Sequence, residues 1–242
     1  MIGYRRSGFT LFELSMVLIM IGFISGGILV GRDLIRAAEN RKLITQMDQY
    51  KLAATTFRNK YNALPGDVES SKAASLGFTA RAGGVGHGDG NGIIDDCNGD
   101  NLISINPSLG CELVLFWSDL SKAQMIENQF TRATDSEPII ANAKEAFDFY
   151  PHARATNNMS QMFIAADSNK ENWFVIARIS SDITLNLSGY GVDFLVSPYN
   201  VTGETAFYID SKLDDGLPET GNIGVGGIPV YDKEWFMGAA TN

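Results

Sequence analysis

Carboxylate and amide side chains gather in a glycine-rich stretch near the middle of the sequence. Residues 81–100 contain seven glycines, and Asp89, Asn91 and Asp95 stand among them. Side-chain oxygens of this type are the ligands that calcium prefers, since Ca²⁺ takes about six to eight hard oxygens. The stretch therefore predicts either a calcium-binding loop or a cluster of turns whose acids are only solvated.

The match to the EF-hand calcium loop is incomplete. Asp89, Asn91 and Asp95 take the third, fifth and ninth positions of that pattern. However, His87 stands where the first aspartate belongs, and Asn98 stands where the bidentate glutamate belongs. Because an asparagine cannot supply a bidentate carboxylate, we expect a calcium site here only if other residues complete it.

A second acidic group lies nearer the C-terminus. The segment from Thr202 to Gly216 predicts a short helix, because threonine caps helix starts and glycine closes helix ends. Asp210 and Asp214 then stand one turn apart, with Asp215 beside them. Like charges at this spacing repel, and acids at a helix C-terminus oppose the helix dipole. A bound cation would relieve this repulsion, and so would a nearby lysine or plain solvation.

Residue patterns typical of an enzyme are missing from the sequence. The two histidines are His87 and His152, and neither belongs to a recognised catalytic or metal-binding motif. Paired carboxylates are frequent, but an acidic chain supplies them by chance. We therefore expect no enzymatic activity and no catalytic residues.

The element that precedes these groups is a long apolar run. From Phe9 to Val30 the only ionisable side chain is Glu13, and Arg5 and Arg6 stand just before the run. At about 1.5 Å per residue the run reaches roughly 33 Å, enough to cross about 30 Å of hydrocarbon. The positive-inside rule then places the N-terminus in the cytoplasm and the rest of the chain across the membrane. A removable signal peptide is the alternative, although no small-x-small cleavage sequence follows the run.

Glu13 is unusual because a carboxylate at membrane depth costs about 2.5–3.5 kcal/mol on insertion scales. Two explanations are open. Thr10 and Glu13 have the S/T-x-x-E spacing of a capping box, in which each side chain bonds the backbone N–H of the other residue. Alternatively, Glu13 pairs with a cation of a neighbouring subunit, such as a free α-amine created by cutting the chain just before the apolar run.

The start of the chain combines a basic pair, a glycine, an aromatic residue and this acid in the string RRSGFTLFEL, from Arg5 to Leu14. The string resembles the class III signal of type IV prepilins and type II secretion pseudopilins. In that family a membrane-embedded aspartyl peptidase cuts after the glycine and methylates the new N-terminal phenylalanine. The resemblance implies that Gly8 precedes the cut, that Phe9 becomes N-methylated, and that Glu13 guides the docking of subunits.

A second motif ends the N-terminal helix. Residues 57–67 read FRNKYNALPGD, which resembles the F-x-x-x-Y-x-x-L-P-G-D exit of pseudopilin-like sequences. Proline and glycine stop the helix there, so we expect one helix from Phe9 to Asn62, about 80 Å long. An apolar stripe along its second half predicts the face that packs on the head. The stripe consists of Ile44, Met47, Ala54, Phe57 and Tyr61.

Charge divides the chain at the end of this helix. Residues 9–64 carry seven bases and four acids, whereas residues 65–242 carry ten bases and 24 acids, a net charge of −14. Such a head has no general attraction for nucleic acid, and we expect no nucleic-acid partner. Cys97 and Cys111 fall in this head, outside the cytoplasm, where disulfides persist. We expect the two cysteines to be paired rather than to be reactive thiols.

The head combines helical and strand patterns. Residues 112–127 place apolar side chains at three- and four-residue steps and predict an amphipathic helix. Gln161–Ala165 and Trp173–Ile179 are β-rich runs around a polar turn, which predicts a hairpin. The fold class is therefore α+β. The resemblance implies a type IV pilin-like fold, in which a long N-terminal helix, transmembrane in one half and amphipathic in the other, packs on a small antiparallel sheet with loop-rich insertions.

The predicted organisation has four parts: a cleaved leader (1–8), a transmembrane and assembly helix (9–31), an amphipathic helix that continues into the head (32–64), and a periplasmic or extracellular globular head (65–242). The resemblance implies a structural subunit of a type IV pilus or a type II secretion pseudopilus. We expect it in the bacterial inner membrane as a single-pass protein, and outside the cell once it is assembled into a pilus.

Expected partners follow from the same resemblance. They are copies of this chain or homologous pilins, the prepilin peptidase and the inner-membrane assembly platform. Calcium is the one expected cofactor, and the family often binds it near the C-terminus, which favours Asp210, Asp214 and Asp215 over the loop of Asp89, Asn91 and Asp95. The alternative function is a monomeric, membrane-tethered periplasmic binding module, which needs neither cleavage between Gly8 and Phe9 nor lateral packing of helices.

Overall fold

The computed structural model describes residues 8, 10–99, 110–136, 144–153, 161–166, 170–177, 203–217, 221 and 223. Phe9 and Thr202, which carry predictions made above, lie outside the described residues, as does the end of the second predicted strand. The chain divides into two compact units, Met1–Glu39 and Asn40–Asn242.

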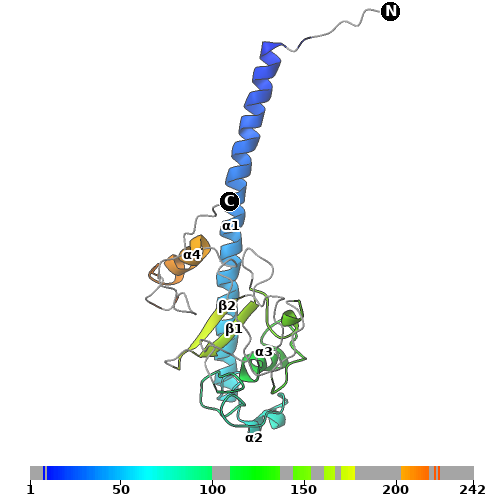
Figure 1. The fold of residues 1–242 in the computed structure, drawn as a ribbon, viewed down its shortest axis with the longest axis vertical. Coiled ribbons are helices and arrows are strands. Elements are labelled where there is room, and N and C mark those ends of the chain that lie inside the picture. Colours follow the sequence, from blue (N-terminus) through cyan, green and yellow to red (C-terminus); the bar gives the residue numbers. More distant parts are fainter. Residues whose placement is uncertain are drawn as a thin grey trace, which may run out of the picture. The chain divides into compact units, whose positions relative to one another are not determined.

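Helix α1 runs from Leu11 to Tyr61, close to the predicted bounds (Figure 1). It begins after Thr10, whose hydroxyl accepts a hydrogen bond from the Glu13 amide at 3.2 Å. It ends at Asn62, which has a left-handed φ of 54° and donates its N–H to the Arg58 carbonyl at 2.8 Å. Asparagine tolerates this conformation better than most residues, so the helix stops before the proline is reached.

The described part of the first unit is residues 8 and 10–39, and most of it is the N-terminal part of α1. Its large apolar side chains between Leu11 and Val30 are all exposed, from 47% at Met16 to 86% at Leu11. Among the described residues, α1 is the one helix long and apolar enough to cross a membrane. An exposed apolar surface of this size is typical of a segment that contacts a membrane or other protein.

The second unit is built on the other part of α1. Its buried apolar side chains in α1 are Leu43, Tyr50, Ala53 and Phe57. The predicted stripe was thus only partly right: Phe57 is buried, but Ile44, Met47, Ala54 and Tyr61 lie at its half-buried margins. The centre of the true stripe includes a polar residue, Gln46, which is 5% exposed and donates a hydrogen bond to the His152 carbonyl at 2.6 Å.

Helix α3, Glu112–Lys122, is the centre of the head rather than a surface helix, because every residue from Glu112 to Ser121 is buried. Its Trp117 ring meets the Tyr50 ring of α1 edge-on, at 4.9 Å between centroids. The helix ends earlier than predicted because Gln124 has φ 58° and the Met125 amide bonds the Leu120 carbonyl at 3.0 Å, which is the pattern of a Schellman motif.

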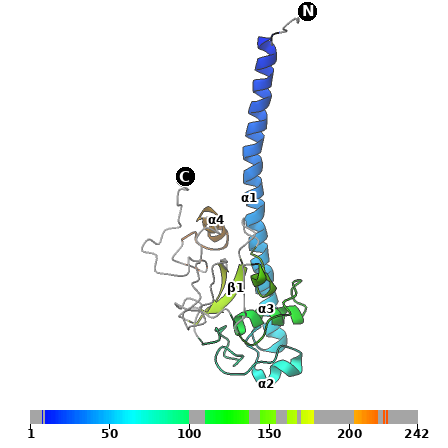
Figure 2. The ribbon, with the colours of Figure 1, turned by 45° about the vertical axis from the view of Figure 1, so that its right-hand side comes forward.

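The predicted hairpin is confirmed as strands β1, Gln161–Ala166, and β2, Asn172–Ala177, which pair antiparallel with Gln161 opposite Ala177. Met162 and Phe163 of β1 are fully buried. Figures 1 and 2 show the pair beside α1 and α3. The head is therefore α+β with a small antiparallel sheet, as the sequence predicts.

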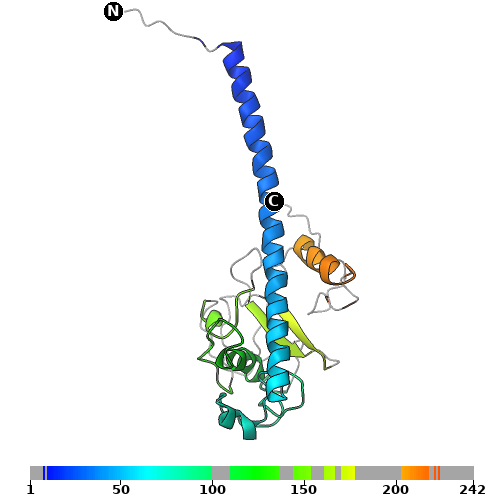
Figure 3. The ribbon, with the colours of Figure 1, turned by 180° about the vertical axis from the view of Figure 1, so that it is seen from behind.

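Shorter elements complete the described part of the head. They are α2, Ser70–Ala73, the 3-10 turns η1, Ala74–Leu76, and η2, Glu145–Asp148, and helix α4, Gly203–Leu213. Helix α4, drawn in orange in Figures 1 and 3, buries Ile209.

Candidate functional site

The first candidate site is the start of α1. The Glu13 carboxylate accepts hydrogen bonds from the Thr10 amide and the Thr10 hydroxyl, both at 2.9 Å, and the Glu13 amide bonds the Thr10 hydroxyl in return. The predicted capping box is therefore confirmed. Gly8, the residue before the predicted cut, is exposed. The capping box does not test whether the Glu13 charge also pairs with a cation of a neighbouring chain.

The second candidate site surrounds Asp89. The structure brings one carboxylate oxygen from each of Asp67, Asp89 and Glu112 within 4.8 Å of one another. Asp67 belongs to the exit motif and is 1% exposed, and Glu112 is the first residue of α3 and is fully buried. Three hard oxygen donors at this spacing match the ligand chemistry of calcium.

Two of these carboxylates hold the glycine-rich loop in place. Glu112 accepts the amides of Gly88 at 2.7 Å and Asp95 at 3.0 Å, one on each oxygen. Asp67 accepts the amides of Gly90 and Gly92, each at 2.7 Å, again one on each oxygen. We call Asp67, Glu112 and these four amides the carboxylate cradle.

Close packing explains the glycines at this site. Gly66 has φ 84°, and a side chain on it would lie 2.5 Å from the Glu112 carbonyl oxygen. Gly88 has φ 75°, and a side chain there would lie 2.6 Å from the Val68 carbonyl oxygen. Only glycine combines this conformation with this approach, so the loop can reach both carboxylates.

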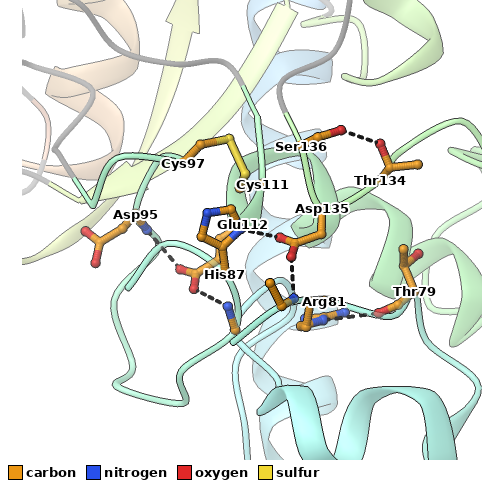
Figure 4. Close-up of polar contacts among 12 residues, drawn as sticks. Thr79, Arg81, His87, Asp95, Cys97, Cys111, Glu112, Thr134, Asp135 and Ser136 are labelled. Carbon is orange, nitrogen blue, oxygen red and sulfur yellow. Dashed lines mark hydrogen bonds and ion pairs between the residues drawn. A yellow bond between two sulfur atoms is a disulfide. The ribbon is translucent and has the colours of Figure 1, made fainter. Parts of the chain in front are cut away.

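The loop residues that were predicted as calcium ligands are therefore not arranged as in an EF-hand. Asn91 bonds Asp89 through both its backbone and side-chain nitrogens, each at 3.0 Å. Asp95 contributes its backbone N–H to the cradle (Figure 4). The carboxylates that join Asp89 are Asp67 and Glu112, neither of which the sequence predicts as a ligand. One local signal was present: Glu112 opens a run of strongly apolar residues that had to be buried.

Ionisation of the two cradle carboxylates costs free energy because both are buried. Burial raises the pKa of Glu112 to about 8, although the Asp95 and Gly88 amides act in the opposite direction, and the charges of Asp67 and Asp89 raise it further. Burial likewise raises the pKa of Asp67 to about 6, against the effect of the Gly92 and Gly90 amides. Both groups therefore bind a proton more tightly in the folded head than in the unfolded chain.

This difference predicts a head that loses stability as the pH rises. Both pKa values are raised on folding, so the stabilisation is complete below about pH 4 and is lost as the pH passes about 6 and then about 8. Without divalent cations, the melting temperature should fall by on the order of 10 °C between pH 5 and pH 9. Calorimetry across this range measures the fall, and Glu112→Gln should reduce its upper part. An equally steep fall in that variant would contradict the assignment.

A buried ion pair fixes the turn that carries Asp67, one of the two carboxylates of the cradle. Arg81 and Asp119 meet at 3.0 Å, and both side chains are fully buried. Asp119 also accepts the Gly66 amide at 2.8 Å, and Arg81 donates to the Gly66 carbonyl at 2.6 Å. The turn that carries Asp67 is therefore fixed to α3 through both polar groups of its glycine.

The third candidate site is the acidic group of α4. The structure brings Asp210, Asp214 and Asp215 within 4.8 Å of one another, as predicted. Asp210 is fully buried, and the Gly216 amide lies near enough to its carboxylate to stabilise the charge. Burial raises its pKa, the Gly216 amide nearby lowers it, and the charges of Asp215 and Asp214 raise it. A buried carboxylate with two acidic neighbours fits the oxygen-ligand chemistry of a calcium ion.

The disulfide is the last predicted feature. Cys97 and Cys111 are bonded, with 5.1 Å between their Cα atoms, which confirms the predicted pairing. His87 lies beside this bond and pairs through Nδ1 with Asp135 Oδ1 at 2.8 Å (Figure 4). The other Asp135 oxygen accepts the Ala82 amide. Figure 4 shows that the disulfide, the imidazole and this carboxylate converge from the loop, the start of α3 and the segment that follows it.

Comparison of the chain with models of known protein families, with curated proteins and with solved structures finds no significant match. The functional argument therefore depends on the residues themselves.

Proposed function

We propose that the chain is a structural subunit of a type IV pilus or a type II secretion pseudopilus, assembled through α1. The observation that carries this proposal is the first part of α1, which exposes every large apolar side chain from Leu11 to Val30 and carries a single acid, Glu13. A membrane covers such a surface before assembly, and the same helices of other copies cover it in a filament core. The N-terminal string resembles a prepilin signal, and this resemblance indicates cleavage between Gly8 and Phe9.

The proposed mechanism is mechanical. The prepilin peptidase removes residues 1–8, and Phe9 then carries a methylated amine. That amine pairs with Glu13 of a neighbouring copy, which sets the axial register of one helix against the next. The head faces the periplasm and emerges from the cell if the filament is a pilus. The fold that this function implies is the type IV pilin fold, consistent with the long helix and the small antiparallel sheet.

The N-terminus of the native protein separates this proposal from a monomeric tether. Intact mass and N-terminal sequencing of protein from its own cells should find Phe9 as the first residue and one added methyl group. A native chain that still begins at Met1 would contradict the proposal, because an uncut helix has no free amine beside Glu13.

A substitution at Gly8 tests the cleavage in the same assay. Gly8→Leu should leave the leader attached, because a bulky side chain at this position blocks the peptidase. Mass spectrometry should find the uncut precursor as the main species, and filaments should be absent. Gly3→Leu is the matched control, since the other leader glycine is outside the string. Mature-size protein in the Gly8 variant would refute the cleavage assignment.

Calcium binding is part of the proposal. Its support is the donor set of Asp210, Asp214 and Asp215, three carboxylates within 4.8 Å of one another, of which Asp210 is fully buried. These three residues would hold the ion, and the ion would remove the repulsion between them. No step of filament assembly depends on it.

Thermal melting with and without calcium tests this part. Calcium at about 100 times its dissociation constant should stabilise the head by about 2.7 kcal/mol, or roughly 5–10 °C. Asp214→Asn should remove most of this shift, and Glu112→Gln should leave it intact. If Glu112→Gln removes the shift instead, the ion binds at the cradle, and a flat response to calcium would refute the site altogether.

A further inference from the structure

The glycine-rich loop contains two Asn-Gly dipeptides, Asn91–Gly92 and Asn98–Gly99, and the sequence has none elsewhere. Asparagine before glycine is prone to deamidation, because glycine has no side chain to hinder its own backbone nitrogen. That nitrogen attacks the asparagine Cγ and closes a ring, a succinimide. The asparagine side chain and the glycine amide must first leave their hydrogen bonds, so the fold decides which of the two dipeptides reacts.

Asn91–Gly92 is held by three hydrogen bonds that oppose this reaction. The Asn91 side chain accepts the Ile93 amide at 2.6 Å and donates to the Asp89 carboxylate at 3.0 Å. The Gly92 amide, whose nitrogen has to attack, donates to the buried Asp67 carboxylate at 2.7 Å. Hydrogen bonds to a charged group are about twice as strong as those between neutral groups. Both partners of the reaction are therefore fixed at this dipeptide.

Asn98–Gly99 is held less firmly. The Asn98 residue is exposed, and its side chain has no hydrogen bond to any residue that the structure describes. Its backbone N–H donates to the Asp96 carboxylate at 2.8 Å, which leaves the side-chain amide free to turn. The Gly99 amide donates to the Asp96 carbonyl at 3.0 Å. The reaction here has to break one backbone hydrogen bond of a turn instead of three hydrogen bonds.

We propose that Asn98 is a site of spontaneous deamidation in the folded head, whereas Asn91 is protected. The Gly99 nitrogen forms a bond to Asn98 Cγ, the bond between Cγ and Nδ2 breaks, and ammonia leaves with the proton of the Gly99 amide. Water then opens the succinimide at either of its two carbonyl carbons. One product is an aspartyl residue, and the other is an isoaspartyl residue, whose backbone is one carbon longer.

The modification changes the loop as well as its charge. Either product adds a negative charge to the residue after Cys97, which is bonded to Cys111. The isoaspartyl product also lengthens the backbone just before Gly99, where packing is close: a side chain on Gly99 would lie 2.6 Å from Val85 Cγ1. We therefore expect the isoaspartyl form of the head to melt at a lower temperature than the unmodified form.

Mass spectrometry of aged protein compares the two asparagines in one sample. Full-length protein in detergent micelles is incubated in mildly alkaline buffer made with water that carries heavy oxygen. It is then digested in acid, and fragmentation assigns each mass increase to a residue. Asn98 should be converted at least about tenfold faster than Asn91, because an opening that breaks more hydrogen bonds is rarer. Each product should contain one oxygen from the solvent. Equal conversion, or faster conversion of Asn91, contradicts the proposal.

The reduced and denatured chain is the reference for this comparison. Both dipeptides should react there at similar rates, since the hydrogen bonds of the folded loop are lost. If Asn91 remains slower by the same factor in the denatured chain, local sequence explains the difference and the proposed protection is wrong. An Asn98 that is still intact in the folded protein when the denatured chain is fully converted also overturns the proposal.

Asn98→Gln is the matched variant. It keeps an exposed amide, but its longer side chain closes a ring much more slowly, so position 98 should stay unmodified at an unchanged initial melting temperature. Aged unchanged protein should then melt at a lower temperature than aged variant. Conversion of position 98 in the variant at the rate of the unchanged chain would exclude attack by the Gly99 nitrogen. Equal melting temperatures of the two aged proteins would contradict the expected effect of the isoaspartyl product.

Discussion

Glu13→Gln should abolish filament formation while the protein still inserts into the membrane. Glutamine completes a capping box as glutamate does, so the hydrogen bonds to the Thr10 amide and hydroxyl can remain. Only the charge is lost. Breaking one side of a buried ion pair costs about 3–5 kcal/mol, so each subunit contact should weaken by at least a hundredfold. Filament yield in sheared cell fractions, compared with total membrane-bound protein, measures the effect.

The control for this experiment is Thr10→Val. It removes the capping hydroxyl, which costs about 1 kcal/mol of helix stability, and it leaves the Glu13 charge in place. Filaments should therefore persist in the Thr10 variant and disappear in the Glu13 variant. If both variants assemble equally well, Glu13 serves the helix start alone and the docking role is wrong.

Arg81→Met should unfold the head or come close to it. The substitution leaves the Asp119 carboxylate fully buried, with the Gly66 amide as its remaining donor. An uncompensated charge of this kind costs about 3–5 kcal/mol, which is a large share of the 5–15 kcal/mol that stabilises a typical domain. It also removes the donor to the Gly66 carbonyl, which fixes the turn before Asp67. Urea unfolding followed by tryptophan fluorescence measures the loss.

Two further variants show whether charge or packing is responsible. Lys72→Met breaks the Lys72–Glu69 pair, whose side chains are 62% and 47% exposed, and should change stability by less than about 1 kcal/mol. The double variant Arg81→Met with Asp119→Leu should recover part of the loss, since it leaves no buried charge. A double variant as unstable as Arg81→Met alone would indicate that packing, not charge, determines the effect.

Features encoded by short spacings were predicted well. The capping box of Thr10 and Glu13, the long helix, the hairpin and the disulfide each depend on residues close in sequence or on the topology of the chain. The face of α1 was less accurate. Its centre includes the buried Gln46, and a pattern of apolar residues at helical spacing cannot predict that a glutamine is buried.

The carboxylate cradle could not be predicted in this way. Asp67 and Glu112 are far apart in sequence: Asp67 looks locally like a solvated acid in a turn, and the apolar run after Glu112 predicts a buried helix but not what the Glu112 carboxylate contacts. They meet because α1 and α3 pack through Tyr50 and Trp117, a tertiary contact that no local pattern encodes. Arg81 and Asp119 were missed for the same reason.

The cradle also fixes the number of residues in the loop that it holds. Surface loops generally accept insertions and deletions, because their backbone groups face water. Here alternate amides, those of Gly88, Gly90 and Gly92, must reach two carboxylates, one in the turn after α1 and one at the start of α3. One added or removed residue would move every later amide out of step with its acceptor, so this glycine-rich segment has a fixed length although its composition suggests a freely variable one.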